Sequence, residues 1–139
     1  MLGLSKSKEK DVQGKILIVD DEPDLVDTIR YRLEFSGYEV LIAENGKEGL
    51  EKAESEKPDI ILLDYGMPVM DGHEMLVRLR NHPDLKEMAV IMVTASSEAQ
   101  DIEKTCSWGI TDYIIKPFDF AVLLDKVASV LDGSKVSKI

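Results

Sequence analysis

The chain has 139 residues, 44% of them hydrophobic, and a formal net charge of -10, which suits one soluble domain with a single core. The lone Cys106 cannot form an internal disulfide, no secretory signal pattern opens the chain, and the apolar runs are far shorter than the roughly 20 residues that span a bilayer. We therefore expect a cytoplasmic protein without membrane insertion and, because it is so acidic, without direct nucleic-acid binding.

The strands are predicted from short apolar runs. Residues 1–14 are polar and without periodicity, so we expect a flexible leader. From Lys15 onward, apolar runs rich in β-branched residues alternate with stretches that have apolar residues at helical spacing. The runs predict five strands, over residues 15–19, 39–43, 60–63, 89–93 and 112–115. Several are apolar at every position, which is typical of parallel strands buried on both faces.

Helices are predicted between the strands and after the last one. Apolar stripes mark the first, third and fifth helices: Leu25, Ile29 and Leu33; Met75, Leu76 and Leu79; Leu123, Leu124, Val127, Val130 and Leu131. Weaker patterns over 46–57 and 97–108 predict two more exposed helices. Pro23 fits a first helical turn, and Gly37, Gly109 and Gly133 stand where helices should end. The alternation predicts an α/β fold of five βα units, and the tail over 133–139 leaves no room for an output domain.

Polar side chains follow four of the five predicted strands. Asp20 and Asp21 follow the first, Asp64 the third, Thr94 the fourth and Lys116 the fifth. Taken alone, each has an ordinary explanation, either as a helix cap or, for Lys116, as a solvated side chain. In an open parallel sheet, however, functional groups collect at the carboxyl ends of the strands. We therefore interpret the five residues as one site.

Three crowded carboxylates require a positive charge among them, because two unit charges about 4 Å apart repel by roughly 4 kcal/mol at an effective dielectric near 20. An all-oxygen ligand set suits Mg²⁺. The sequence has no Cys/His cluster for zinc, and His73 and His82, in or beside the third helix, are expected at the surface. The chemistry that fits is transfer of a phosphoryl group to Asp64, with Mg²⁺ bound by the three aspartates and with Lys116 and Thr94 contacting the phosphoryl group.

Four segments carry a resemblance to a known family. KILIVDDEP, IILLDYGMPVMDG, VIMVTAS and DYIIKPF resemble the signature segments of response-regulator receiver domains, the chemotaxis-regulator-like modules of two-component signalling. The resemblance spans about residues 15 to 131. It implies a (βα)₅ flavodoxin-like, doubly wound parallel sheet in strand order 2-1-3-4-5, with a receiver domain over 15–132. It also implies that a sensor histidine kinase or a histidine phosphotransfer protein donates the phosphoryl group.

The resemblance implies a role for each residue at the phosphorylation site. Asp64 is then the phosphoacceptor, and Asp21 ligates the metal directly. Asp20 assists, and Gly66 offers its backbone carbonyl. The protein would be a phosphoacceptor that catalyses only its own phosphoryl transfer and hydrolysis, and not a turnover enzyme.

A switch is also implied by the resemblance. Thr94 is its hydroxyl, Lys116 the ion-pair partner and Tyr113 the aromatic that moves inward, while Lys116–Pro117 is a cis peptide. A dianionic phosphoryl group would draw in the Thr94 hydroxyl and make space for the ring. The face formed by the fourth helix, fifth strand and fifth helix would then report the state to a downstream protein.

Two positions depart from the family pattern. Gly66 replaces a larger side chain that influences attacking water, so the lifetime of the phosphoryl group stays open. Trp108 replaces a small residue at the base of the predicted signalling face. We expect a packed aromatic there, with a partner anchor as the alternative.

Three other functions compete with this interpretation. A receiver-like docking module that is never phosphorylated is disfavoured by the intact acidic group, Thr94 and Lys116. A hydrolase that forms an aspartyl phosphate would need a second acid where Gly66 stands. A nucleotide-binding Rossmann protein would need a G-x-G-x-x-G after the first strand, and the sequence has none there. Whether the chain acts alone or belongs to a longer protein stays open.

Overall fold

The computed structural model describes residues 13–95, 103 and 105–133. Its elements follow in the order β1 (Lys15–Val19), α2 (Pro23–Phe35), β2 (Glu39–Ala43), α3 (Gly46–Glu56), β3 (Ile60–Asp64), α4 (Gly72–Arg80), β4 (Ala89–Ala95), β5 (Asp112–Lys116) and α6 (Phe120–Asp132). All five predicted strands are confirmed. The last three extend one or two residues further than predicted, because Asp64 still pairs with Val93 and Ala95 with Lys116 in the parallel ladder.

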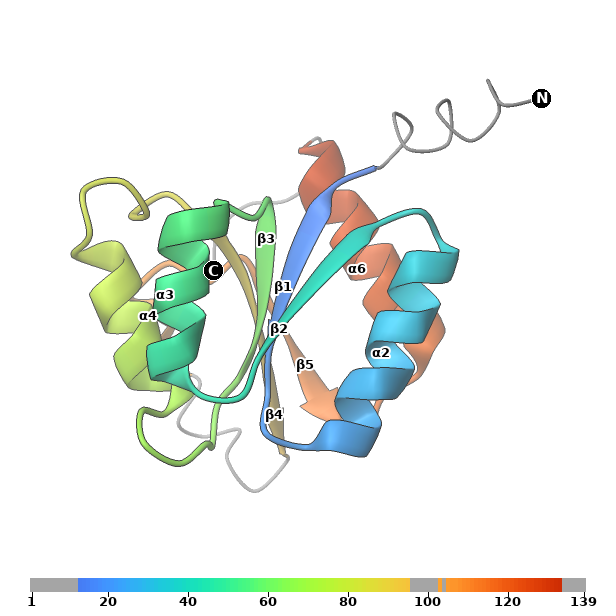
Figure 1. The fold of residues 1–139 in the computed structure, drawn as a ribbon, viewed down its shortest axis with the longest axis horizontal. Helices are drawn as coiled ribbons and strands as arrows, with labels where there is room; N and C mark the ends of the chain where they lie inside the picture. The colour runs from blue at the N-terminus through green and yellow to red at the C-terminus, as the bar shows by residue number, and fades with distance from the viewer. Residues whose placement is uncertain (1–12, 96–102, 104, 134–139) are drawn as a thin grey trace.

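The five strands form one parallel sheet in the order β2-β1-β3-β4-β5, as predicted. Figure 1 shows α2 and α6 on one face of the sheet and α3 and α4 on the other. The predicted helix over 97–108 lies mostly outside the described residues. Within this segment the structure describes Glu103, Thr105 and Cys106 as helical. No helix in the described part of the chain is long and apolar enough to span a bilayer.

The core consists of two apolar layers that share the sheet. Alternate residues of β1 divide between them: Ile16 and Ile18 pack toward α2 and α6, whereas Leu17 and Val19 pack toward α3 and α4. All four side chains are at most 1% exposed. Full burial of a side chain of this size contributes about 1.5–3 kcal/mol, so the two layers fix the register of the central strands.

Pro23 and Gly133 lie at helix ends, as predicted from the sequence. Pro23 occupies the first position of α2, where its missing N–H costs no hydrogen bond. Gly133 ends α6 with φ +71°, a left-handed conformation that glycine adopts without a Cβ clash. The strands of the sheet all run parallel, so their carboxyl ends lie at the same edge.

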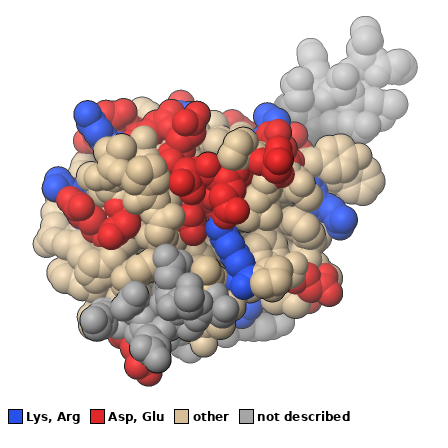
Figure 2. Space-filling view, turned by 90° about the horizontal axis from the view of Figure 1, so that it is seen from below, with Lys and Arg blue, Asp and Glu red and all other residues tan. Residues whose placement is uncertain are grey.

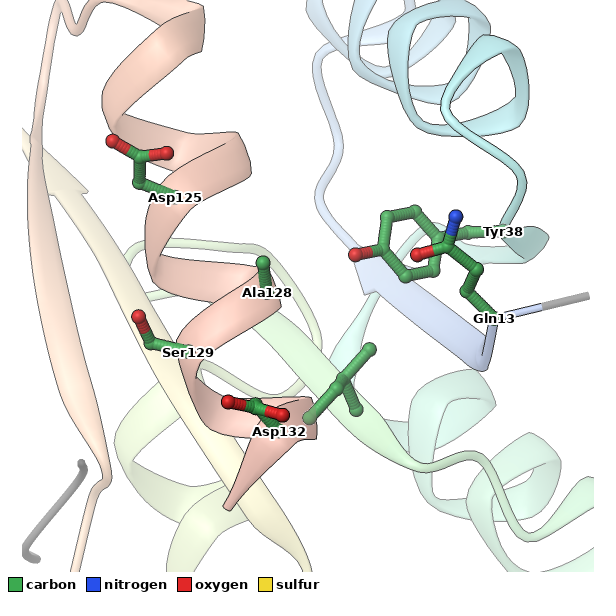
Figure 3. Close-up of a pocket in the computed structure, with 7 residues that line it drawn as sticks. Gln13, Tyr38, Asp125, Ala128, Ser129 and Asp132 are labelled. Carbon is green, nitrogen blue, oxygen red and sulfur yellow. The ribbon is translucent and has the colours of Figure 1, made fainter. Parts of the chain in front are cut away.

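A recess of about 720 Å³ lies at the opposite, amino-terminal end of β1 (Figure 3). Tyr38 and Gln13 face α6 across it, where Asp125, Ser129 and Asp132 lie. None of the residues predicted to carry chemistry lines this recess. The polar groups of interest are instead at the carboxyl ends of the strands.

Candidate functional site at the carboxyl ends of the strands

Three aspartates meet where β1 and β3 end. Each of Asp20, Asp21 and Asp64 offers one carboxylate oxygen, and these oxygens lie within 4.8 Å of one another. Asp20 and Asp64 are buried, with 4% and 5% exposure, whereas Asp21 is exposed. Acidic residues also gather around this edge in the view onto the strand ends (Figure 2). The arrangement fits a hard divalent cation, which binds carboxylates while part of its shell stays open to solvent.

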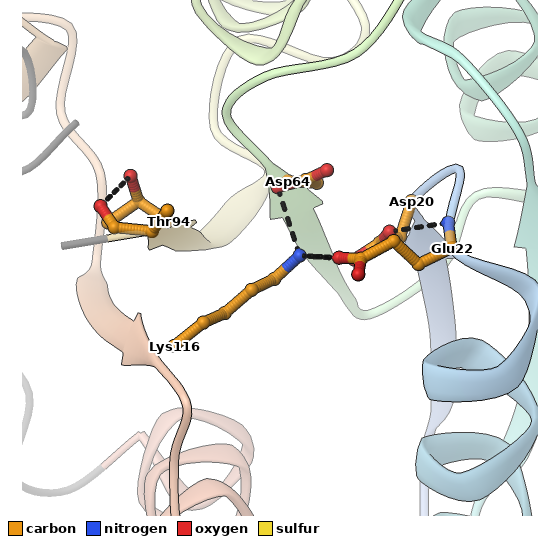
Figure 4. Close-up of polar contacts among 6 residues, drawn as sticks. Asp20, Glu22, Asp64, Thr94 and Lys116 are labelled. Atoms are coloured by element: carbon orange, nitrogen blue, oxygen red, sulfur yellow. Dashed lines mark hydrogen bonds and ion pairs between the residues drawn. The ribbon is translucent and has the colours of Figure 1, made fainter. Parts of the chain in front are cut away.

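The Lys116 ammonium lies among these carboxylates (Figure 4). Its Nζ donates to Asp20 Oδ2 at 3.2 Å, to Asp64 Oδ1 at 3.3 Å and to Glu22 Oε1 at 2.5 Å. The Lys116 side chain is only 16% exposed, so the alternative that it is simply solvated is wrong. The sequence reasoning correctly brought Lys116 to the aspartates but did not include Glu22.

Burial sets the protonation behaviour of the buried aspartates. It raises the pKa of Asp64 to about 7; the charge of Asp20 adds to this rise, and Lys116 opposes it. Burial likewise raises the pKa of Asp20, against the hydrogen bond from the Glu22 N–H and the charge of Lys116. Burial alone would lower the pKa of Lys116, but the hydrogen bond to Glu22 and the charges of Asp64 and Asp20 hold it above its ordinary value. The site therefore favours a bound cation beside Lys116.

A tight turn after β3 places Asp64 beside the start of α4. The Gly72 N–H donates to Tyr65 O at 2.8 Å, and a Cβ on Gly72 would lie 2.3 Å from the Asp64 carbonyl oxygen. Only glycine allows this approach. Asp71 accepts a hydrogen bond from the Glu74 N–H at 2.8 Å and so caps α4. The MDG segment thus fixes the backbone at the predicted phosphoacceptor.

The predicted switch residues occupy β4 and β5. Thr94 is fully buried, and its hydroxyl donates to the Ala95 carbonyl at 3.2 Å, on the side away from Asp64 (Figure 4). Tyr113 is 38% exposed on β5. The Lys116–Pro117 peptide is cis. Gly66 is exposed beyond Asp64, and its carbonyl as a metal ligand stays a prediction.

A comparison with protein-family models decides the family. The model described as "Response regulator receiver domain" matches residues 16–128. The chain belongs to this family. The recognition from sequence is therefore confirmed, and with it the membership in two-component signalling that the family implies.

Two similar proteins differ in how much of their own length the match covers. This receiver is 37% identical over 120 residues to Protein PilH of Pseudomonas aeruginosa, a match that covers 86% of the chain and 99% of PilH. It is 40% identical over 123 residues to the alkaline phosphatase synthesis transcriptional regulatory protein PhoP of Bacillus subtilis, covering 88% of the chain but 50% of PhoP. The chain thus spans about half the length of that relative.

Solved structures agree with the fold. The chemotaxis response regulator CheY4 of Vibrio cholerae superimposes with a TM-score of 0.77 at 32% sequence identity, covering 84% of this chain and 97% of CheY4. Members of the family generally bind Mg²⁺ at an acidic pocket, and the three aspartates of this receiver form such a cluster.

The alternative explanation of the aspartates as caps of the first helix is wrong. The N-cap of α2 is Glu22, not an aspartate, and Asp20 instead accepts a hydrogen bond from the Glu22 N–H at 2.9 Å. His73 and His82 are both partly exposed, which agrees with the expected position at the surface. His82 lies 3.1 Å from Glu54 of α3, and the buried Nδ1 of His73 has no hydrogen-bond partner.

Trp108 packs against the apolar layer beneath α3 and α4, as expected. Its backbone carbonyl accepts from Arg80 Nε at 2.7 Å, and Arg80 donates to three further carbonyls, those of Lys86, Met88 and Gly109. Arg80 thus ties the end of α4 to the segments that enter β4 and β5. Sequence reasoning missed this residue, because backbone carbonyls leave no pattern in the sequence.

Proposed function

We propose that this receiver is a phosphoacceptor, phosphorylated on Asp64 with Mg²⁺ by a sensor histidine kinase or a histidine phosphotransfer protein. The observation that carries the proposal is the convergence of Asp20, Asp21 and Asp64 on one point, with the Lys116 ammonium 3.3 Å from Asp64. A lone buried acid would need no such surroundings. A carboxylate that takes up a dianionic group needs cationic neighbours. The Lys116 ammonium is one, and the three aspartates are ligands for a metal ion as the other.

In the proposed reaction a carboxylate oxygen of Asp64 attacks the phosphorus of a phosphohistidine. A P–O bond forms and the P–N bond breaks, and its electron pair stays on the imidazole nitrogen. Lys116 neutralises charge on the transferring oxygens, and the Thr94 hydroxyl turns from Ala95 to donate to the new phosphoryl group. The receiver catalyses only this transfer and the later hydrolysis.

Asp20, Asp21 and Asp64 would hold the Mg²⁺ ion, with the Gly66 carbonyl as a further ligand. The ion supplies positive charge that screens the carboxylate from the incoming phosphoryl oxygens. Asp21, being exposed, gives the ion a route from solvent, whereas the buried Asp20 and Asp64 fix its position.

The phosphorylated state would be reported to a downstream protein by the face formed by the predicted helix over 97–108, β5 and α6. Three partly exposed apolar side chains lie on the described part of this face: Tyr113 at 38%, Ile115 at 38% and Val122 at 44%. They line a shallow recess together with Phe118. Inward movement of Tyr113 would reshape this recess, which couples the phosphoryl group to partner binding.

The test is incubation with acetyl phosphate and Mg²⁺, followed by intact mass measurement. We expect one added phosphoryl group on the wild type and none on Asp64→Asn or in EDTA. No adduct on the wild type under any condition would replace this proposal with the unphosphorylated docking module. A cytoplasmic location is part of the proposal, since the phosphodonor and the reduced Cys106 both belong there.

A further inference from the structure

Glu22 occupies the N-cap of α2 but does not act as a cap. Its side chain makes no capping hydrogen bond, whereas Asn45, Asp71 and Asp119 each accept one from the first turn of α3, α4 and α6. Glutamate is also not among the residues favoured at this position. The Glu22 carboxylate instead accepts from Lys116 Nζ at 2.5 Å. The Glu22 side chain at the start of α2 therefore contacts the site and does not cap the helix.

The other two acceptors of Lys116 belong to the aspartate cluster. Asp20 Oδ2 and Asp64 Oδ1 lie 3.2 and 3.3 Å from Nζ, and both residues also offer oxygens to a metal ion. An ammonium and a divalent cation at the same carboxylates repel each other and compete for the same ligands. Entry of the metal must therefore weaken the contacts of Lys116 with Asp20 and Asp64.

Glu22 is not one of the three clustered aspartates, so its carboxylate would be left to accept from Lys116 when a metal occupies them. A largely buried ammonium without an acceptor would be costly, and Lys116 is only 16% exposed. We propose that Glu22 is a positioning residue that retains Lys116 at the edge of the site, so that Mg²⁺ and the ammonium are bound there together. The inference rests on the metal site of the proposed function, but not on phosphorylation itself.

The test is Mg²⁺ affinity, measured by titration of amide NMR signals with MgCl₂ in the absence of any phosphodonor. Glu22→Gln exchanges a charge-assisted hydrogen bond for a neutral one, and we expect the affinity to fall roughly fivefold or more. Glu22→Asp keeps the charge but is one methylene shorter, so it should lose most of the same affinity. A wild-type affinity in Glu22→Asp would show that charge alone matters and would overturn the proposal.

Glu44 provides a matched control, because it lines the acidic recess beside Asp20 and Asp21. We expect Glu44→Gln to change the Mg²⁺ affinity by less than about twofold, an effect of charge screened by solvent. An equal loss in Glu44→Gln and Glu22→Gln would contradict a role for the contact with Lys116.

A double-mutant cycle isolates that contact. Without the ammonium Glu22 has nothing to retain, so in a Lys116→Met background Glu22→Gln should change the affinity by less than about twofold. The same loss in both backgrounds would overturn the proposal. Failure of the proposed function is distinguishable, because it would appear as normal Mg²⁺ binding without an acetyl phosphate adduct. A wild-type protein that does not bind Mg²⁺ would rule out both the proposed function and the role of Glu22.

Discussion

The Lys116 ammonium lies 3.3 Å from the Asp64 carboxylate, although 52 positions separate the two residues in the sequence. The parallel sheet causes this approach: β3 and β5 flank β4, and all three strands end at the same edge. The contact places an amine beside the predicted phosphoacceptor, and it makes the charge state of each group depend on the other.

The raised pKa of Asp64 predicts a pH-dependent stability for the metal-free receiver. Its pKa rises from 3.8 to about 7 in the folded state, first through burial and then through the charge of Asp20. The folded state therefore holds the extra proton between these values, and the stabilisation by the neutral acid, fully present below about pH 4, is lost as the pH rises through about 7. In EDTA, the free energy of unfolding of the wild type should fall between about pH 5 and pH 8. This fall should exceed that of Asp64→Asn by about 2–3 kcal/mol. Urea unfolding at both pH values measures this, and parallel curves for the two proteins would refute it.

Removal of the Lys116 amine should destabilise the metal-free protein. Lys116→Ala leaves the buried Asp20 and Asp64 without their cation, which we expect to cost about 1–3 kcal/mol near pH 8, and added Mg²⁺ should restore part of it. Lys126→Ala is the control, since Lys126 contacts Asp112 at 2.7 Å but both side chains are about 30% exposed. Its cost should stay below about 1 kcal/mol. Equal costs for the two variants, measured by chemical unfolding, would argue against a special role for Lys116.

The close approach at Gly72 predicts a large effect of one added methyl group. A Cβ there would lie 2.3 Å from the Asp64 carbonyl oxygen and 2.9 Å from Tyr65 Cα, both backbone atoms that cannot rotate away. Gly72→Ala should therefore cost about 2 kcal/mol or more and weaken Mg²⁺ binding by shifting Asp64. Gly133→Ala, with φ +71° but no atom within 4 Å of the added Cβ, should cost only about 1 kcal/mol and leave Mg²⁺ binding unchanged. Thermal unfolding and Mg²⁺ titration of both variants give the comparison.

Arg80 should matter more than any exposed arginine of α4. Arg80→Ala removes four hydrogen bonds to backbone carbonyls, for which we expect a loss of about 2–4 kcal/mol in unfolding free energy. Arg80→Lys should not rescue it, because an ammonium lacks the planar fork that reaches several acceptors at once. Arg78→Ala, which breaks only an exposed pair with Glu74, should cost less than about 0.5 kcal/mol. Full rescue by lysine would show that charge alone is needed.

The sequence predicted the strands and the central site well for a physical reason. A strand buried on both faces, such as β3, is apolar up to its last residue, and the polar Asp64 stands out against that run. Asp20, Asp64 and Lys116 were therefore recognisable as neighbours before the fold was known. The length of each strand was less certain, because Thr94 and Ala95 continue the ladder without an apolar pattern.

Glu22 and Arg80 were missed because their partners are not marked in the sequence. Glu22 contacts Lys116 across 94 positions, and an acid after Asp20 and Asp21 looks like part of an ordinary first helical turn. The useful sign would have been that glutamate is a poor N-cap. Arg80 binds only backbone carbonyls, which every residue has, so only the folded structure could reveal its role.

The central claim is that Asp64 is the phosphoacceptor, and the most direct measurement locates the modification on the chain. After reaction with acetyl phosphate and Mg²⁺, borohydride reduces an aspartyl phosphate to homoserine, which peptide mass spectrometry assigns to a position. The account predicts homoserine at position 64 in the wild type, absent without Mg²⁺. Homoserine at another aspartate, or an unmodified Asp64 in a protein that gains a phosphoryl group, would contradict it.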